Sequence, residues 1–308
     1  MSTHAPVRTI PDQTGRTWLV TGATNGIGRE VARSAAAAGA RIIVPGRAPE
    51  RVSALADELR ALGGDPVTGA LDLADLASVR RFAASVDEPV DVLVDNAGAA
   101  SPRRRETADG FELVLGTNFL GPFALTNLLA DRVRERIVIV GSDAHRGARI
   151  DGADPHFRHR RWTFPAAYGQ SKLADMLWAR ALQSRLDARA SGVRVELAHP
   201  GWALTNIQNV TGAAALDRVV TAVTALVAQS AHAGAWPVLQ AAVSDLPPLT
   251  YLGPDGAGHL RGRPSSQETS ALARDDDAAE AVWALGVRET GTDLRPRASE
   301  PTDGRAAG

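Results

Sequence analysis

The sequence has no cysteine and very little lysine, tyrosine or methionine. Its 308 residues contain 0 Cys, 2 Met and 2 Tyr, and Lys172 is the only lysine among 34 basic residues. The absence of cysteine excludes disulfides, cysteine nucleophiles and thiolate metal sites. Because arginine serves at every other basic position, the single lysine indicates a place that needs a compact, flexible ammonium.

Charge and long hydrophobic runs are also scarce. The formal net charge is -1, which gives no reason to expect nucleic acid or a membrane surface as a partner. No run approaches the roughly 18 apolar residues that a membrane span needs. Residues 1–15 are polar, contain Pro6 and Pro11, and lack the apolar segment of a signal peptide. We therefore expect a cytoplasmic protein.

Short β-branched runs alternate with longer amphipathic stretches along the first two thirds of the chain. Strands are expected at Thr17–Thr21, Arg41–Pro45, Pro66–Ala70, Val90–Asp95, Arg136–Val140 and Val193–Ala198. Helices are expected at Gly26–Ala38, Glu50–Leu62, Asp75–Val86, Asp109–Leu129 and Ala166–Ala190. This alternation predicts an α/β protein with a single-domain Rossmann fold, a doubly wound parallel sheet with helices on both faces.

No repeat or linker divides the chain, so residues 15–290 are expected to form one domain after an N-terminal extension at 1–14. Residues 291–308 are rich in Pro, Gly and charge, which predicts a disordered tail. Residues 205–230 contain an amphipathic helical pattern that packs in a core or forms a substrate lid.

A glycine cluster follows the first strand and opens the first helix. Glycines let a backbone turn sharply and approach a pyrophosphate, whose charge favours a helix N-terminus. The spacing GxxxGxG after a strand therefore indicates a dinucleotide-binding loop. The loop residues expected to contact the cofactor are Gly22, Thr24, Asn25, Gly26, Ile27 and Gly28.

The end of the second strand bears on the choice of nicotinamide cofactor. An NAD enzyme commonly carries an acid there, which accepts a hydrogen bond from the ribose 2′-hydroxyl. This chain has Gly46 and then Arg47, whose guanidinium can fork onto a 2′-phosphate. NADP(H) is therefore the expected cofactor.

Tyr168 and Lys172 lie four residues apart near the start of the long expected helix. Residues at this spacing share a helix face, so the phenol and the ammonium can point into one site. A free phenol ionises near pH 10, and a nearby cation favours its ionised form. The pair is thus a candidate for proton transfer.

These motifs resemble those of the short-chain dehydrogenase/reductase family. TGATNGIG, DNAG at Asp95–Gly98, TNFLG with Asn118, GSDAH with Ser142, YGQSK, and HPG at His199–Gly201 follow the family's order over Thr17 to Thr205. The resemblance implies that Tyr168 is the general acid/base and that Lys172 binds the nicotinamide ribose. It also implies that Ser142 binds the reacting carbonyl and that Asn118 holds a proton-relaying water.

The same resemblance implies further cofactor contacts. They are expected at Asp72 and Leu73 near the adenine, at Asn96, Ala97 and Gly98 along the cofactor, and at Pro200, Gly201 and Thr205 near the nicotinamide, beside Tyr168 and Lys172. The long segment between Ser142 and Tyr168 resembles the retinol-dehydrogenase-like and protochlorophyllide-reductase-like branch. The expected substrate is a carbonyl or alcohol of a fairly apolar small molecule.

Other interpretations of the sequence stay open. An NAD-dependent epimerase or dehydratase of the same fold is one alternative, and a catalytically silent NADP(H)-binding regulatory protein is another. The run Arg158–Arg161 is typical of a solvated loop, although it could bind an anionic substrate or a partner. His145 and His199 lack partners at helical ligand spacing, so no metal is expected. The sequence does not decide whether the chain forms a homo-oligomer.

Overall fold

The computed structural model of the protein describes residues 9–201 and 229–294. An eight-stranded sheet with the order β3-β2-β1-β4-β5-β6-β7-β8 forms its centre. The strands are β1 (Thr17–Val20), β2 (Arg41–Gly46), β3 (Asp65–Ala70), β4 (Val90–Asp95), β5 (Val133–Val140), β6 (Arg194–Ala198), β7 (Tyr251–Pro254) and β8 (Pro264–Gln267). Neighbours from β3 through β7 are parallel, and β8 adds an antiparallel edge.

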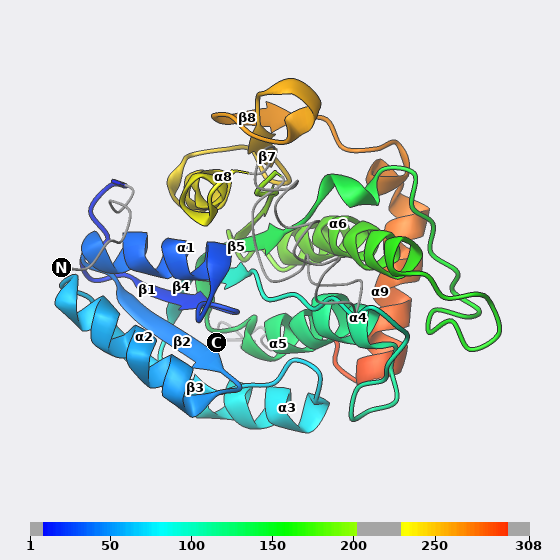
Figure 1. Cartoon of the computed structure of the whole chain (residues 1–308), viewed down its shortest axis with the longest axis horizontal. Helices are drawn as coiled ribbons and strands as arrows, with labels where there is room; N and C mark the ends of the chain where they lie inside the picture. The colour runs from blue at the N-terminus through cyan, green and yellow to red at the C-terminus, as the bar shows by residue number, and fades with distance from the viewer. Residues whose placement is uncertain (1–8, 202–228, 295–308) are drawn as a thin grey trace, which may run out of the picture.

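Helices cover both faces of this sheet (Figure 1). One face carries α1 (Gly26–Ala37), α2 (Pro49–Ala61) and α8 (Ala231–Val243). The other carries α3 (Leu76–Ser85), α5 (Gly121–Leu129), α6 (Phe164–Ala188) and α9 (Asp276–Thr290). The predicted doubly wound Rossmann fold is confirmed.

The central strands read as apolar runs because both of their faces are covered. In β1, Trp18, Leu19 and Val20 are fully buried. Their side chains alternate between the two faces, so Leu19 joins the core under α3 and α6 while Trp18 and Val20 join the core under α1 and α8.

Side-chain caps set the starts of several helices. Asp75 accepts hydrogen bonds from the Ala77 and Ser78 amides and begins α3. Thr163 caps α6, whose first turn also holds a proline, and Asp275 caps α9. These side chains satisfy amides that have no partner within the helix.

The helix expected over Asp109–Leu129 differs in form from a continuous α-helix. Gly110 adopts φ 79° in a turn, and the helix begins at α4 (Leu113–Leu115). A π-helical turn, η1 (Gly116–Leu120), then leads into α5. Such turns widen a helix locally and are frequent at functional sites.

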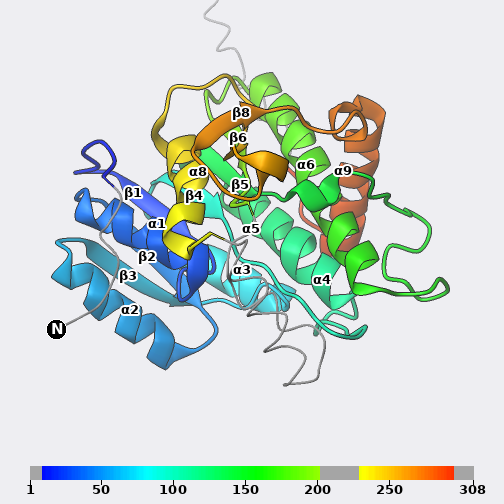
Figure 2. The same ribbon diagram turned by 45° about the horizontal axis from the view of Figure 1, so that its top comes forward.

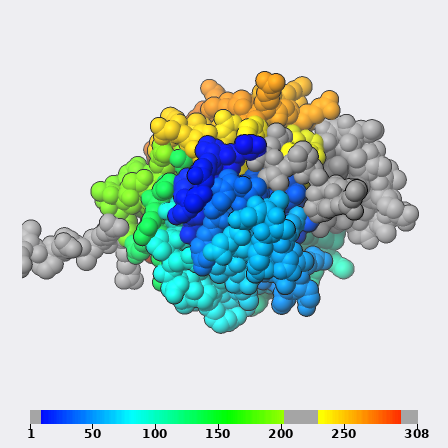
Figure 3. All heavy atoms as spheres, turned by 90° about the vertical axis from the view of Figure 1, so that its left-hand side faces the viewer, coloured from blue at the N-terminus to red at the C-terminus, as the bar shows by residue number. Residues whose placement is uncertain are grey.

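The C-terminal part supplies elements that the sequence did not predict. Figure 2 shows β6 and β8 between α8 and α6, and β7 lies between these two strands in the sheet. The space-filling view in Figure 3 shows the yellow-to-orange C-terminal segment adjoining the blue N-terminal third on one face of the molecule. No helix in the described part of the chain is long and apolar enough to span a membrane.

Candidate active site

The predicted site residues follow strands that point the same way. The glycine loop follows β1, Asn96–Gly98 follow β4, Ser142 follows β5, and Pro200 follows β6. Because β1, β4, β5 and β6 are parallel neighbours, their carboxyl ends meet at one edge of the sheet. The structure therefore brings these segments together.

The glycine loop has no room for larger residues. Gly22 has φ 68°, and a Cβ there would lie 2.8 Å from the Ala97 Cα. A Cβ at Gly28 would lie 2.4 Å from the Asn96 side-chain nitrogen. Gly26 begins α1 with φ 55°, so the backbone turns directly into the helix N-terminus. Thr24 and Asn25 are at least partly solvent-accessible in this loop, and Ile27 is buried beneath it.

Thr21 and Asn96 join the glycine loop to the end of β4. The Thr21 hydroxyl accepts hydrogen bonds from the Asn96 and Ala97 amides, at 3.0 and 3.1 Å. The Asn96 side chain in turn donates to the Thr21 carbonyl at 2.9 Å. These three hydrogen bonds thus join the loop after β1 to the segment after β4.

Arg47 and Asp72 face each other at the ends of β2 and β3. The Arg47 guanidinium lies 3.9 Å from the Asp72 carboxylate, and its side chain is 70% exposed. Asp72 also accepts from the Ala74 amide, while Leu73 beside it is buried. Arg47 and Asp72 therefore lie together at the surface, and Leu73 is buried beside them.

Asn118 is held inside the π-helical turn η1 and is 3% exposed. Its side-chain oxygen accepts from the Ala99 amide at 2.6 Å, and its nitrogen donates to the Ser171 hydroxyl at 3.1 Å. Ser171 donates to the Tyr168 carbonyl on α6. Asn118 therefore connects the segment after β4 to the helix that carries Tyr168.

Tyr168 and Lys172 share one face of α6, as their spacing predicts. The Lys172 ammonium lies 5.9 Å from the centre of the Tyr168 ring. The ammonium donates to the Val140 carbonyl at the end of β5 and to the Asp175 carboxylate, both at 2.8 Å. Ser142 comes two residues after Val140.

Asp175 is a residue of this site that the sequence analysis missed. Burial acts to lower the pKa of Lys172, but the Asp175 carboxylate and Tyr168 together outweigh burial, and the pKa is raised. The signal in the sequence is an acid three residues after the lone lysine, in a stretch of α6 that is otherwise mostly apolar.

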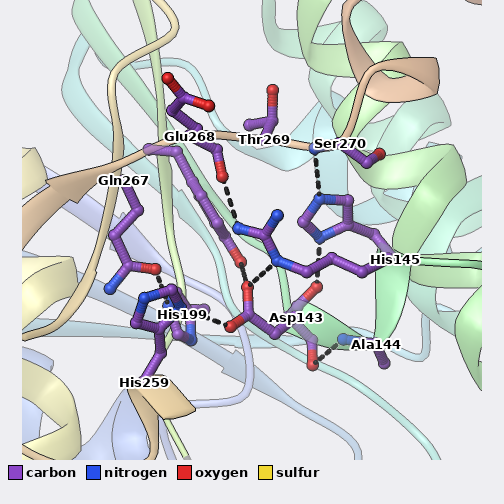
Figure 4. A network of polar contacts seen from close by, with 12 residues as sticks. Asp143, Ala144, His145, His199, His259, Gln267, Glu268, Thr269 and Ser270 are labelled. Atoms are coloured by element: carbon purple, nitrogen blue, oxygen red, sulfur yellow. Dashed lines mark hydrogen bonds and ion pairs between the residues drawn. The ribbon is translucent and has the colours of Figure 1, made fainter. Parts of the chain in front are cut away.

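The loop after β5 is joined to the C-terminal segment by a polar network (Figure 4). His145 is 1% exposed and its Nδ1 lies 2.8 Å from the Ser142 carbonyl oxygen. The Ser270 amide donates to its Nε2 at 3.1 Å, so the proton sits on Nδ1 and donates to Ser142. Burial lowers the pKa of His145, which keeps the ring neutral.

Asp143, His199 and His259 lie in the same network, with candidate metal-ligand atoms within 4.8 Å of one another. Sequence spacing did not predict this cluster. Asp143 is 3.0 Å from His259 Nδ1. His199 accepts from the Gly201 amide at Nδ1 and lies 2.9 Å from Gln267 at Nε2. Neither nitrogen of His199 therefore keeps a free lone pair, and we interpret the cluster as a hydrogen-bond network.

Of the remaining predicted cofactor-binding residues, the structure describes Gly98, Pro200 and Gly201 but not Thr205. Pro200 and Gly201 follow β6, and a Cβ at Gly201 would lie 2.5 Å from the Leu260 carbonyl oxygen. A Cβ at Gly98 would lie 3.5 Å from the Asn118 side-chain oxygen. Thr205 and nearly all of the expected lid at 205–230 lie outside the described residues.

The arginine run before α6 is only partly solvated. Arg158 and Arg161 are exposed, whereas the Arg160 guanidinium lies 3.7 Å from the centre of the Phe157 ring and donates to the side chain of Gln170. The loop is further ordered by Asp154, which accepts from three backbone amides within the run.

The short chain dehydrogenase model matches residues 16–215. The chain therefore belongs to the short-chain dehydrogenase/reductase family, a family of oxidoreductases. It is 40% identical to mouse polyprenol dehydrogenase over 92% of this chain and 86% of that protein. It is 34% identical to human retinol dehydrogenase 13 over 95% of this chain and 89% of that protein. The predicted likeness to retinol dehydrogenases is confirmed.

Solved structures agree on the fold. A crystal structure of an uncharacterized protein from Mycobacterium paratuberculosis has a TM-score of 0.80 and 39% identity, covering 92% of this chain and 97% of that chain. A blue fluorescent protein from a metagenomic library, in complex with NADPH, has a TM-score of 0.58 and 27% identity, covering 75% of this chain and 92% of that chain.

Proposed function

We propose that this oxidoreductase uses NADP(H) to interconvert the carbonyl and alcohol forms of a fairly apolar small molecule, with Tyr168 as the general acid/base. The observation that carries the proposal is the arrangement of Tyr168 and Lys172 on one face of α6, with the ammonium 5.9 Å from the ring centre. The ammonium is also bonded to the end of the strand that leads into Ser142.

The glycine loop fits a dinucleotide. A Cβ at Gly22 or Gly28 would meet neighbouring atoms within 3 Å, so this surface tolerates only bare backbone. Bare backbone at a helix N-terminus is suited to a pyrophosphate. Gly22, Gly26 and Gly28 would hold the phosphates, Lys172 the nicotinamide ribose, and the bound nicotinamide would supply or accept the hydride.

The chain's own side chains supply the proton chemistry. Reduction of a carbonyl builds negative charge on its oxygen, and a pair of hydroxyls can stabilise that charge. Ser142 would donate a hydrogen bond to this oxygen, and Tyr168 would donate the proton. In the oxidative direction the Tyr168 phenolate would accept the proton of the alcohol. Lys172 places a positive charge 5.9 Å from the Tyr168 ring centre, on the same face of α6.

Two observations support the choice of NADP(H) and of an apolar substrate. Gly46–Arg47 leaves no acid at the end of β2 and offers a guanidinium to a 2′-phosphate, which favours NADP(H) over NAD(H). Two proteins that resemble the chain over most of its length are named for polyprenol and retinol, both apolar alcohols. For this chain we propose an apolar substrate, without assigning polyprenol or retinol to it.

Replacing Tyr168 by Phe tests the proposal. Purified protein would be screened with NADPH against a panel of apolar aldehydes and ketones, including octanal and retinal, by the loss of NADPH absorbance. We expect turnover by the wild type and a loss of at least about a hundredfold in Tyr168→Phe. NADPH binding, measured by fluorescence, should be nearly unchanged in the variant. Wild-type turnover in Tyr168→Phe would overturn the proposal, as would a wild type that does not bind NADPH.

A further inference from the structure

Phe164, Tyr168 and Lys172 lie four residues apart along α6. Residues at this spacing share a helix face. The rings of Phe164 and Tyr168 are stacked, with their centroids 5.5 Å apart and their planes inclined by 29°. The Lys172 ammonium lies 5.9 Å from the centre of the same Tyr168 ring. Tyr168 therefore lies between a cation and a phenyl ring along one face of the helix.

Solvent exposure changes along this face. Lys172 is buried, whereas Tyr168 and Phe164 are partly exposed. Phe164 is also the first residue of α6, so it marks the open end of the face. Under the proposed function the nicotinamide ribose lies against Lys172. Because the cofactor would take the Lys172 end, the end at Phe164 is left for the body of the substrate.

The Phe164 ring is not part of the protein's core. Among the described residues, it packs against none of the three hydrophobic core clusters, and its ring contact is with Tyr168. Tyr168 also packs against a separate cluster of buried apolar side chains, namely Val114, Phe157 and Ala167. That cluster can hold the phenol in place without Phe164. The ring of Phe164 thus leaves apolar area beside the reacting group, and aromatic side chains commonly line ligand sites.

We propose that Phe164 is a specificity-determining residue, which selects substrates with an extended apolar group by packing its ring against that group while Tyr168 contacts the reacting oxygen. The inference rests on the proposed function for the reacting oxygen, and it adds the residue that recognises the apolar part. Covering apolar surface is favourable in proportion to the area removed from water. A longer chain covers more of the ring, so the preference should grow with chain length.

The preference can be measured with two aldehydes of different length. Values of kcat/KM for octanal and for propanal would be determined from the loss of NADPH absorbance. A disturbance of Tyr168 itself lowers both values alike, so their ratio isolates the apolar contact. We expect the wild type to favour octanal. In Phe164→Ala the ratio of the octanal value to the propanal value should fall about tenfold.

Companion variants separate the apolar contact from other effects of the substitution. Phe164→Gln puts a polar chain in place of the ring and should lower the ratio even if the Ala variant folds poorly. Phe164→Leu keeps an apolar side chain and should retain most of the ratio. Leu62→Ala removes a partly exposed apolar side chain at the C-cap of α2 and should leave the ratio unchanged. A ratio within about twofold of the wild type in either Phe164→Ala or Phe164→Gln would overturn the inference.

Binding of an apolar alcohol gives a second readout that needs no turnover. Retinol would be titrated into the cofactor-free protein and followed by energy transfer from tryptophan, of which the chain has 6. We expect Phe164→Ala to bind retinol about tenfold more weakly than the wild type, and Leu62→Ala to bind it equally well. A wild type that neither prefers octanal nor binds retinol would overturn the inference.

The two readouts distinguish this inference from the proposed function. If Tyr168→Phe retains turnover while retinol binding weakens in Phe164→Ala, the proposed function fails and the Phe164 inference stands. If Tyr168→Phe is inactive and neither the aldehyde ratio nor retinol binding changes in Phe164→Ala, the reverse holds.

Discussion

The Arg47 guanidinium lies 3.9 Å from the Asp72 carboxylate across the ends of β2 and β3, with 70% of the arginine side chain exposed. Exposed ion pairs contribute at most about 1 kcal/mol to stability, so the Arg47–Asp72 pair is weak. A 2′-phosphate would therefore have little to displace in order to bind Arg47. The carboxylate of Asp72 would keep the guanidinium at the edge of the site until then.

Replacing Arg47 by Ala should weaken NADPH binding about tenfold and leave NADH binding nearly unchanged, because only the 2′-phosphate loses a charged partner. Both dissociation constants can be measured by fluorescence titration. Arg51→Ala, which removes an exposed arginine from α2, is the matched control. A preference for NADPH that survives in Arg47→Ala would exclude this residue as its source.

Replacing Gly28 by Ala should abolish dinucleotide binding and lower the melting temperature, because the new Cβ would lie 2.4 Å from the Asn96 side-chain nitrogen. Gly152→Ala is the control, because a Cβ there meets nothing within 4 Å and the residue has no positive φ. Calorimetric titration with NADPH checks the first effect and a thermal melt the second. Normal binding in Gly28→Ala would mean that the loop does not hold the cofactor.

Replacing His145 by Ala should destabilise the protein by about 2 kcal/mol, because it removes two hydrogen bonds of a side chain that is 1% exposed and leaves the Ser270 amide without that partner. His259→Ala, whose side chain is 41% exposed, should cost less than about 1 kcal/mol. Urea unfolding measures both values. Equal costs for the two variants would contradict the part that His145 plays in the network.

Glu196 on β6 is fully buried, and burial raises its pKa to about 8 against the attraction of Arg136 and Arg194. The folded state therefore binds a proton that the unfolded chain releases near pH 4.5. Folding stability should fall as pH rises from about 4.5 to 8, and Glu196→Gln should lose roughly 4–5 kcal/mol less over that range, at about 1.4 kcal/mol per pKa unit.

Urea unfolding at several pH values measures this dependence. Glu268→Gln, at an exposed carboxylate, should leave the slope of the unfolding free energy against pH unchanged. A slope in Glu196→Gln equal to that of the wild type would show that Glu196 does not carry the proton.

The Rossmann core was predictable because its signals are local and strong. Buried parallel strands such as β4, with the sequence VDVLVD, are rich in β-branched and apolar residues, and the expected Val90–Asp95 agrees with the structure at both ends. The pairing of Tyr168 with Lys172 follows from helical spacing alone. These features depend on residues that are close in the sequence.

Features that depend on distant partners were not predictable. His145 acquires its role from Ser270, and Asp143 meets His259, each more than a hundred residues away. The π-helical turn at Gly116–Leu120 has no periodicity that distinguishes it from an α-helix. The short strand β8 pairs antiparallel with β7 at the sheet edge, and its polar sequence Pro264–Gln267 carries little strand signal.

Lys172 is the only lysine of the chain, and its side chain is 9% exposed. Apart from the α-amino group, an acylating or reductively methylating reagent therefore has a single amine to modify, and that amine lies within the candidate active site. The mass added at Lys172 becomes a one-residue footprint of access to the site. Protection of this amine by added NADPH would report occupancy in a plain mass spectrum, without a label, an engineered residue or a known substrate.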